Sequence, residues 1–526
     1  MSMSMSDGEE LTRLSARALA ARIASGDVSA VEAVEAHIAR IEAVNPRLNA
    51  VVVTRYAAAR EEARAGDQRR ATSKPLPPLH GVPVTIKESL DLAGTPSTFG
   101  FAGRKGVLAE ADDLYVARLR AAGAIVLGKT NVAQALLYNE SDNPAYGRTN
   151  NPWNLARTPG GSSGGQAAIL AAGGSPLGLG TDLAGSIRVP ANYCGVVGMR
   201  PTVGRCEDAG RYSLPLGERA IVSQVGPLAR TVDDVALALE ILNGGRAPAV
   251  EPPRPLGDPA AADIARLRVA YYTDDGTFAV SPAVRRAVVE AAGHLAGRGA
   301  QVAEWRPPAV GDAVALLFGI FSADGGRGLR ALLAHEQKDP RLAQLAALAA
   351  QPAPTLAVLG ALLRLLGQRT AAGTIRNFGH RDTHHYWRLV EEQLAYQRRF
   401  AAALDGDEGG PFDVIVCPAH ALAAIPHGAS KDIVVGGGYI VLYNVLGYPA
   451  GVVPVTRVRA DEESARKRSR DAAERTARRS ELGSAGLPVG VQVVARPWHE
   501  HVALAAMRVI EEMARKSADY PAQAPL

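Results

Sequence analysis

Short runs of apolar, mostly β-branched residues recur along the chain and alternate with stretches of helical spacing. The apolar runs are bounded by glycine or proline, which is typical of buried strands: Val82–Ile86, Ala124–Leu127, Val414–Val416, Val452–Val455 and Val489–Val494. The helical stretches include Asp113–Ala122, Gln166–Ala172 and Thr231–Leu242. This alternation predicts an α/β fold, in which a mixed, twisted β-sheet is flanked by helices on both faces.

The first strong helix signal divides a polar start from the rest of the chain. Ser29 and Glu32 form a capping-box pattern, which predicts a helix running to about Val44, where Asn45-Pro46 closes it. Because large α/β enzymes often exceed the common size of ~150 residues per domain, we expect one domain over 29–515. Residues 1–28 are then a polar, helical lead-in, and residues 516–526 a tail.

Two segments within that domain have unusual patterns. Residues 341–369 hold two short amphipathic stretches broken by Pro352-Ala-Pro354, and the second places four leucines on one face, Leu356, Leu359, Leu363 and Leu366. These stretches are either core-packing helices or an exposed apolar cap. Residues 460–480 are dense in both charge signs, which predicts an inserted, solvated helix or loop.

Composition excludes several classes of protein. Hydrophobic residues make up 47% of the chain, so disorder is excluded as its general state, while 5% aromatics and a net charge of +5 argue against nucleic acid. The three cysteines have no spacing typical of a disulfide framework or zinc site. Because neither a secretory signal nor a membrane-spanning stretch is recognisable, we expect a cytoplasmic protein, with peripheral membrane contact left open.

Two short motifs are ambiguous. Gly123–Thr130 matches the nucleotide-binding pattern GxxxxGK[ST], but its four middle residues, Ala-Ile-Val-Leu, have the character of a buried strand. We interpret this match as accidental and keep a noncatalytic nucleotide-binding protein as an alternative. Gly160–Gly165 matches the GxSxG nucleophile elbow twice, centred on Ser162 and on Ser163, yet a loop rather than a strand precedes it.

The continuation of that turn is far more informative. Gly160–Thr202 reads GGSSGGQAAILAAGGSPLGLGTDLAGSIRVPANYCGVVGMRPT, which resembles the hallmark block of the amidase signature family. The resemblance to that family extends to Gly81–Lys87 and Gly128–Gln134. Further segments are similar to the fatty acid amide hydrolase branch of the family in particular: Tyr271–Asp275, Phe321–Arg327, Leu442–Asn444, Tyr448–Pro454 and Gly486–Val494. The resemblance covers nearly the whole chain, from about residue 29 to about residue 515.

Amide hydrolysis needs an activated nucleophile, a proton carrier and donors for the developing oxyanion. Ser186 lies among small residues, and no histidine occurs in the matching blocks, so another base is needed. Lys87 follows apolar Val84 and Ile86, and burial there can lower the pKa of its amine enough for it to act as a base. The resemblance implies that Ser186 is the nucleophile, Ser162 the bridging serine and Lys87 the base.

The resemblance also implies the surroundings of these residues. The peptide bond Gly161–Ser162 is expected to be cis, and Asp182 and Arg188 are expected to brace the nucleophile loop. The oxyanion donors fall on the backbone N–H groups of four consecutive residues, Leu183, Ala184, Gly185 and Ser186. Ala184 stands where many members carry glycine. Leu136, Leu137 and Tyr138 fall where the family lines its acyl pocket.

Taken together, these observations predict a serine amidohydrolase that forms an acyl-enzyme without a metal or cofactor. The expected substrates are small-molecule amides, above all fatty acid amides of the N-acylethanolamine or primary type. A glutaminase subunit of a tRNA-dependent amidotransferase is the alternative within the family. We expect no nucleic acid partner and a reversible membrane contact through a cap at 341–369, and we leave a homodimer open.

Overall fold

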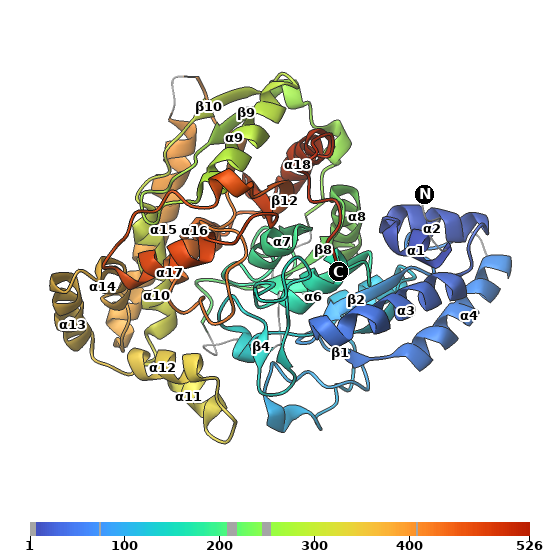
Figure 1. Ribbon diagram of the computed structural model, residues 1–526, viewed down its shortest axis with the longest axis horizontal. Coiled ribbons are helices and arrows are strands. Elements are labelled where there is room, and N and C mark those ends of the chain that lie inside the picture. Colours follow the sequence, from blue (N-terminus) through green and yellow to red (C-terminus); the bar gives the residue numbers. More distant parts are fainter. Residues whose placement is uncertain (1–6, 73–74, 208–217, 245–253, 407–408) are drawn as a thin grey trace.

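Eleven strands form one mixed sheet in a computed structural model that describes residues 7–72, 75–207, 218–244, 254–406 and 409–526. Their spatial order is β1-β3-β2-β6-β8-β7-β12-β13-β11-β9-β10 (Figure 1). The strands are β1 (Val51–Thr54), β2 (Pro83–Lys87), β3 (Ile125–Thr130), β6 (Leu177–Asp182), β7 (Val197–Arg200), β8 (Gln224–Ala229), β9 (Arg268–Tyr271), β10 (Gln301–Glu304), β11 (Val414–Pro418), β12 (Ala450–Arg457) and β13 (Pro488–Ala495). A small hairpin of β4 (Asp142–Asn143) and β5 (Gly147–Arg148) lies apart from the sheet.

Strand directions in the sheet are mixed, as predicted. β2 is parallel to both β3 and β6, whereas β12 is antiparallel to both β7 and β13. Every residue of β2, β3, β6, β8 and β13 is buried. Because strands covered on both faces are largely apolar, they appear in the sequence as nearly continuous apolar runs rather than alternating ones. All five predicted apolar runs are strands.

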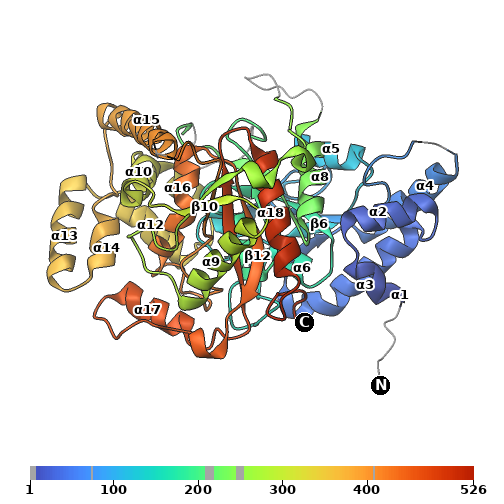
Figure 2. The same cartoon turned by 90° about the horizontal axis from the view of Figure 1, so that it is seen from above.

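Helices cover both faces of the sheet, which confirms the predicted fold class. The helices up to residue 322 are α1 (Asp7–Arg13), α2 (Ala16–Ser25), α3 (Ala30–Leu48), α4 (Tyr56–Thr72), α5 (Leu114–Ala121), α6 (Gly164–Ala171), α7 (Arg188–Cys194), α8 (Val232–Asn243), α9 (Pro282–Ala296) and α10 (Val310–Ser322). The remaining helices are α11 (Arg327–Leu333), α12 (Pro340–Ala349), α13 (Ala353–Leu365), α14 (Arg369–Ile375), α15 (Thr383–Asp405), α16 (Gly438–Leu446), α17 (Ala472–Glu481) and α18 (Glu500–Ala514). α6 and α7 pack on one face, and α8, α9 and α18 on the other (Figure 2).

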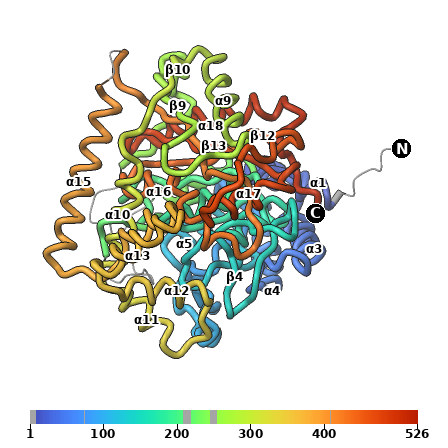
Figure 3. The backbone as a smooth tube through the Cα atoms, turned by 60° about the vertical axis from the view of Figure 1, so that its left-hand side comes forward, coloured from blue at the N-terminus to red at the C-terminus, as the bar shows by residue number. Residues whose placement is uncertain are grey.

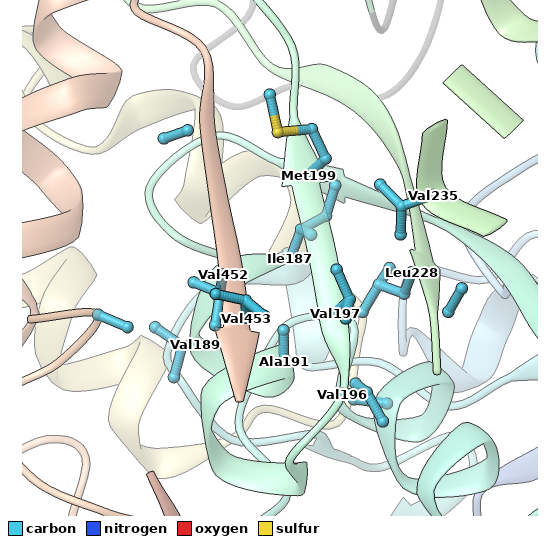
Figure 4. Packing of buried hydrophobic residues seen from close by; sticks show 14 of the residues in the cluster. Ile187, Val189, Ala191, Val196, Val197, Met199, Leu228, Val235, Val452 and Val453 are labelled. Carbon is cyan, nitrogen blue, oxygen red and sulfur yellow. The ribbon is translucent and has the colours of Figure 1, made fainter. Parts of the chain in front are cut away.

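The centre of the core lies between α7 and the strands β7 and β12 (Figure 4). Val189 and Ala191 of α7 are fully buried, as are Val197 and Met199 of β7 and Val452 of β12. Burial of each such side chain contributes about 1.5–3 kcal/mol. This packing fixes the position of α7, and therefore of the loop that enters it.

The N-terminal helices pack onto the sheet layer rather than standing apart. Asp234 of α8 accepts hydrogen bonds from the backbone N–H groups of Ala16 and Arg17, at 2.8 and 2.9 Å. The capping box that begins α3 is present as predicted, but the predicted end at Asn45-Pro46 is wrong, because α3 continues to Leu48. Proline in the last turn removes only one N–H, and the helix ends at left-handed Asn49 instead.

Residues 341–369 form two helices, α12 and α13, broken at Pro352 as predicted. They gather with α11 and α14 at one side of the molecule, beside α15 (Figure 3). Of the four leucines predicted to share one face, Leu356 is buried and Leu363 half-buried, whereas Leu359 and Leu366 are 38% and 63% exposed. The exposed apolar face of α13 is formed mainly by Val358, Leu362, Leu365 and the C-cap residue Leu366, which are 73%, 52%, 86% and 63% exposed. No helix of the described chain is both long and apolar enough to span a bilayer.

The charged segment 460–480 is more ordered than predicted. It contains most of α17, which buries one face, including Ala473 and Ala477. Arg466, whose side chain is 6% exposed, forms ion pairs with Glu474 at 2.5 Å and Glu481 at 2.8 Å. Part of the segment's charge is therefore paired, and α17 packs against α14 instead of being simply solvated.

The interpretation of Gly123–Thr130 as an accidental match is confirmed. Ile125–Thr130 is the buried strand β3, so no flexible turn is present between a strand and a helix to bind phosphate. The Lys129 amine is directed into the protein and donates to Pro96 O at 2.5 Å and Ser97 Oγ at 2.8 Å.

Candidate active site

Lys87 is the last residue of β2 and is fully buried. Its Nζ donates to Ser162 Oγ at 2.7 Å and to Thr181 Oγ1 at 2.8 Å. Thr181 lies near the end of β6, which is the parallel neighbour of β2. Because parallel strands end at the same edge of a sheet, Lys87 and the residues that follow β6 meet there.

Ser162 lies in the glycine-rich turn that enters α6. The peptide bond Gly161–Ser162 is cis, as the resemblance implies. A Cβ atom on Gly161 would lie 2.6 Å from the backbone nitrogen of Glu140, so this position requires glycine. Ser141 holds the turn, because its Oγ accepts from Gly164 N at 2.9 Å and donates to Gly160 O at 3.1 Å.

Ser186 lies in the loop between β6 and α7, and this loop touches the glycine-rich turn directly. The backbone N–H of Ser163 donates to Ser186 O at 3.1 Å. Ser186 itself is only partly buried, whereas Ser162 and Lys87 are fully buried. The structure therefore brings all three predicted catalytic residues to one edge of the sheet, with Ser186 the most accessible of them.

The loop carrying Ser186 is held by a buried ion pair. Arg188 donates to Asp182 through Nε and Nη2, each at 3.0 Å, and both side chains are fully buried. Arg188 also donates to Gln492 at 2.6 Å and Asn444 at 2.5 Å. Burial alone would raise the pKa of Asp182, but the Arg188 guanidinium outweighs it and holds that pKa well below its usual range. These contacts give Asp182 and Arg188 the bracing position expected from the sequence.

The expected oxyanion donors need one correction. The backbone N–H of Gly185 donates to Asp182 Oδ1 at 2.8 Å, so it braces the loop and is not free for a substrate. Among the described residues no acceptor is found for the backbone N–H groups of Leu183, Ala184 or Ser186. Gly185 has φ +104°, and a Cβ there would lie 2.5 Å from Ile440, so glycine is required at this position.

An apolar cavity of about 510 Å³ opens beside this loop. Leu183 and Ala184 form part of its wall, and side chains of α10, α12, α14 and α16 form much of the remainder: Leu317, Phe318, Phe321, Leu345, Leu348, Ile375 and Val441. Leu137 and Tyr138 line the cavity, whereas Leu136 packs against a separate small cluster around Phe99 and Phe101.

Several site features were not identified from the sequence. Thr181 contacts Lys87, and Ala472 and Ala473 of the charged segment line the cavity. The small residues of Thr181–Ser186 indicated a tight loop, but nothing in the sequence indicated that the Thr181 hydroxyl contacts Lys87. In the described part of the chain no three His, Cys, Asp or Glu side chains gather in a way suited to a metal ion.

Comparison with known proteins places the chain in a family. An amidase family model matches residues 32–504. Fatty-acid amide hydrolase 1 of Sus scrofa is 35% identical over 521 residues, which cover 96% of this chain and 87% of that protein. A glutamyl-tRNA(Gln) amidotransferase chain of Roseiflexus castenholzii is 38% identical, but over 61% of this chain and 64% of that one. A solved structure of fatty acid amide hydrolase matches with a TM-score of 0.81 at 25% identity, covering 98% of this chain and 87% of the other. The chain therefore belongs to the amidase signature family and is a hydrolase that acts on amide C–N bonds.

Proposed function

We propose that the protein is a serine amidohydrolase for fatty acid amides, in which Ser186, Ser162 and Lys87 act as nucleophile, bridge and base. The observation that carries this proposal is the 2.7 Å contact between Lys87 Nζ and Ser162 Oγ. The loop that carries Ser186 borders an apolar cavity through Leu183 and Ala184. In this proposal the Lys87 amine acts in its neutral form, which can accept a proton. A neutral amine would reverse that hydrogen bond and accept from Ser162.

The proton path follows from this contact. Ser162 takes the proton of Ser186 as it passes its own proton to Lys87, and Ser186 Oγ forms a bond to the amide carbon. The tetrahedral intermediate collapses when the leaving nitrogen receives a proton back through the same path, and the C–N bond breaks. Water then attacks the ester of Ser186 in the same way and releases the free acid.

The oxyanion is stabilised by backbone donors in this proposal. The N–H groups of Leu183, Ala184 and Ser186 are the ones without an acceptor among the described residues. Alanine in place of glycine at position 184 retains its N–H and adds only a methyl group, and Ala184 lines the cavity. Loss of one such donor typically costs about 10²–10³-fold in kcat.

The acyl chain occupies the apolar cavity in this proposal, with Leu137 and Tyr138 in contact with it. Similarity to fatty acid amide hydrolases over 96% of the chain supports this substrate class, whereas the similarity to the amidotransferase covers much less. The exposed apolar face of α13 supports a reversible contact with a membrane, from which lipid amides would enter.

A fluorophosphonate probe and a panel of amides from acetyl to oleoyl test the proposal. We expect covalent labelling of Ser186 that is absent from Ser186→Ala, and turnover that rises with chain length. Glutamine and short amides are tested in parallel, as the substrates that the alternative within the family would favour. Labelling with equal turnover of glutamine and no long-chain preference would favour the glutaminase alternative. ATP-dependent thermal stabilisation without labelling would favour a nucleotide-binding protein and overturn the proposal.

A further inference from the structure

A second hollow lies apart from the amide site, where the starts of α13 and α15 meet the start of α11. Its volume is about 620 Å³, and its lining carries five cationic or imidazole side chains: Arg327, Arg330, His380, Arg381 and His385. Among the described residues that line it, Asp382 is the one carboxylate. That carboxylate already accepts from the backbone N–H and ring Nδ1 of His385, each at 2.8 Å. The hollow therefore keeps an excess of positive charge.

Backbone carbonyls accept hydrogen bonds from two of the three arginines and hold them in place. Arg330 donates through Nη1 to Gly325 O at 2.5 Å, and Arg381 donates through Nη2 to Asn377 O at 3.4 Å. In the described parts of the chain, neither these two arginines nor Arg327 forms an ion pair with a carboxylate. A guanidinium has five N–H donors, so most of them stay available to a ligand.

The N-terminus of α13 also borders this hollow. Pro352 is the N-cap of this 13-residue helix, and its side chain makes no capping hydrogen bond. Pro352, Ala353 and Pro354 all line the hollow. Neither proline has an N–H to donate, so this helix start contributes the positive end of the helix dipole, which favours an anion. This effect is independent of the arginines, and it also favours a negatively charged ligand.

We infer that this hollow binds a phosphate group carried by a small organic molecule or by a lipid headgroup. Phosphate is favoured because it offers several acceptor oxygens to more than one planar guanidinium, and its double charge suits the uncompensated arginines. The hollow of about 620 Å³ leaves room for an organic group attached to the phosphate. The exposed apolar face of α13 begins close to the hollow, which makes a phospholipid one of the two sources.

Binding measurements on the full chain test this inference without reference to amide turnover. The probes are glycerol 3-phosphate, inorganic phosphate, and phosphatidylcholine vesicles with and without phosphatidic acid. The test variant is Arg327→Gln with Arg381→Gln, and Arg327→Gln alone serves if the double variant does not fold. The control is Arg364→Gln with Arg398→Gln, which removes the same charge outside the hollow. None of these residues lines the amide cavity, so short-amide turnover should be unchanged in every folded variant.

We expect saturable binding that weakens at least tenfold in the Arg327 and Arg381 variant and stays within twofold in the control. Tight binding of glycerol 3-phosphate would assign the site to a soluble phosphate compound, whereas specific binding only to phosphatidic acid vesicles would assign it to a headgroup. Equal losses in both double variants would show general electrostatics, and the inference would then be wrong. It would also be wrong if no probe bound more tightly than chloride at the same ionic strength.

Discussion

The amine of Lys87 and the hydroxyl of Ser162 lie 2.7 Å apart, although 75 residues separate them in the chain. Lys87 ends β2, and Ser162 precedes α6, which packs on β2 and β6. The contact therefore depends on the order of the central strands rather than on any local sequence feature. In the proposed mechanism the proton passes across this contact, from the hydroxyl of Ser162 to the amine of Lys87.

If these residues form one relay, their substitutions should not be additive. Ser186→Ala should abolish amide hydrolysis, because it removes the attacking oxygen. Lys87→Ala and Ser162→Ala should each lower kcat by about 10²–10⁴-fold, the usual range for a proton carrier. Their double variant should lose little more than the worse single one. Steady-state kinetics on a short soluble amide measure this.

The neighbouring hydroxyl offers a matched control for that experiment. Ser163 Oγ donates to Thr181 O at 3.4 Å, and in the described part of the chain it forms no hydrogen bond with Lys87. Ser163→Ala should therefore keep most of the activity. Additive losses at Lys87 and Ser162, or near wild-type turnover in Ser186→Ala, would count against the relay.

The ion pair of Asp182 and Arg188 predicts a large stability effect. Arg188→Met leaves the fully buried Asp182 carboxylate without its guanidinium partner, although Asn444 and backbone N–H groups still donate to it. Losing one partner of a buried pair typically costs about 3–5 kcal/mol. Denaturant unfolding should show a loss of that size. Adding Asp182→Asn should recover part of it, since the neutral amide no longer needs a cation.

A loss below about 1 kcal/mol in Arg188→Met would show that the pair is not a main support of the loop. Arg200 provides a comparison, because it lies 3.9 Å from Asp182 and burial lowers its pKa to about 9. Its more distant guanidinium should matter less, so Arg200→Met should destabilise the protein through lost packing but change kcat less than Arg188→Met.

Much of the fold could be predicted because buried strands leave a strong trace in the sequence. Each of the five apolar runs is a strand, since a strand covered on both faces is mostly apolar along its length. The end of α3 was missed because Pro46 costs little in a last turn. Proline indicates that a helix ends nearby, but it does not fix the residue at which the last turn stops.

The site residues could be predicted only where they lie in a recognisable sequence motif. Ser162 and Ser186 lie in one recognisable block, but Thr181 beside Lys87 and Ala473 in the cavity wall depend on tertiary contacts. The engagement of Gly185 by Asp182 was also missed, because loop sequence does not show which N–H groups the protein itself uses. Which residues of α13 are exposed could not be predicted, because its packing partner, α14, could not be placed from the sequence.

Buried His420 predicts a loss of stability in acid. Burial lowers the pKa of His420 to about 4, against an ordinary value of about 6.5 in an unfolded chain. Between these values the unfolded chain binds a proton that the folded protein does not, so stability is lost as pH falls from about 6.5 to 4. The full window corresponds to about 3 kcal/mol. Urea unfolding at several pH values measures it.

His420→Gln should flatten this pH dependence, whereas His384→Gln, at an exposed position of α15, should leave it unchanged. A residual slope is expected from His37, whose pKa burial also lowers to about 4. If His420→Gln kept the full wild-type slope, the histidine would not be responsible for the acid sensitivity.

The two faces of α13 separate a membrane contact from core packing. Leu362 and Leu365 are 52% and 86% exposed, whereas Leu356 is 1% exposed. Each leucine that enters a bilayer contributes up to about 1.5–3 kcal/mol, so two glutamates on the exposed face should remove vesicle binding. Leu362→Glu with Leu365→Glu should therefore keep its melting temperature and its short-amide turnover but lose liposome binding and long-chain turnover. Leu356→Glu is the contrasting variant, because an unpaired buried charge should destabilise the fold and lower activity on every substrate. Wild-type liposome binding by the Leu362 and Leu365 variant would show that α13 is not the contact surface, and a lowered melting temperature would show that its outer face is packed rather than free.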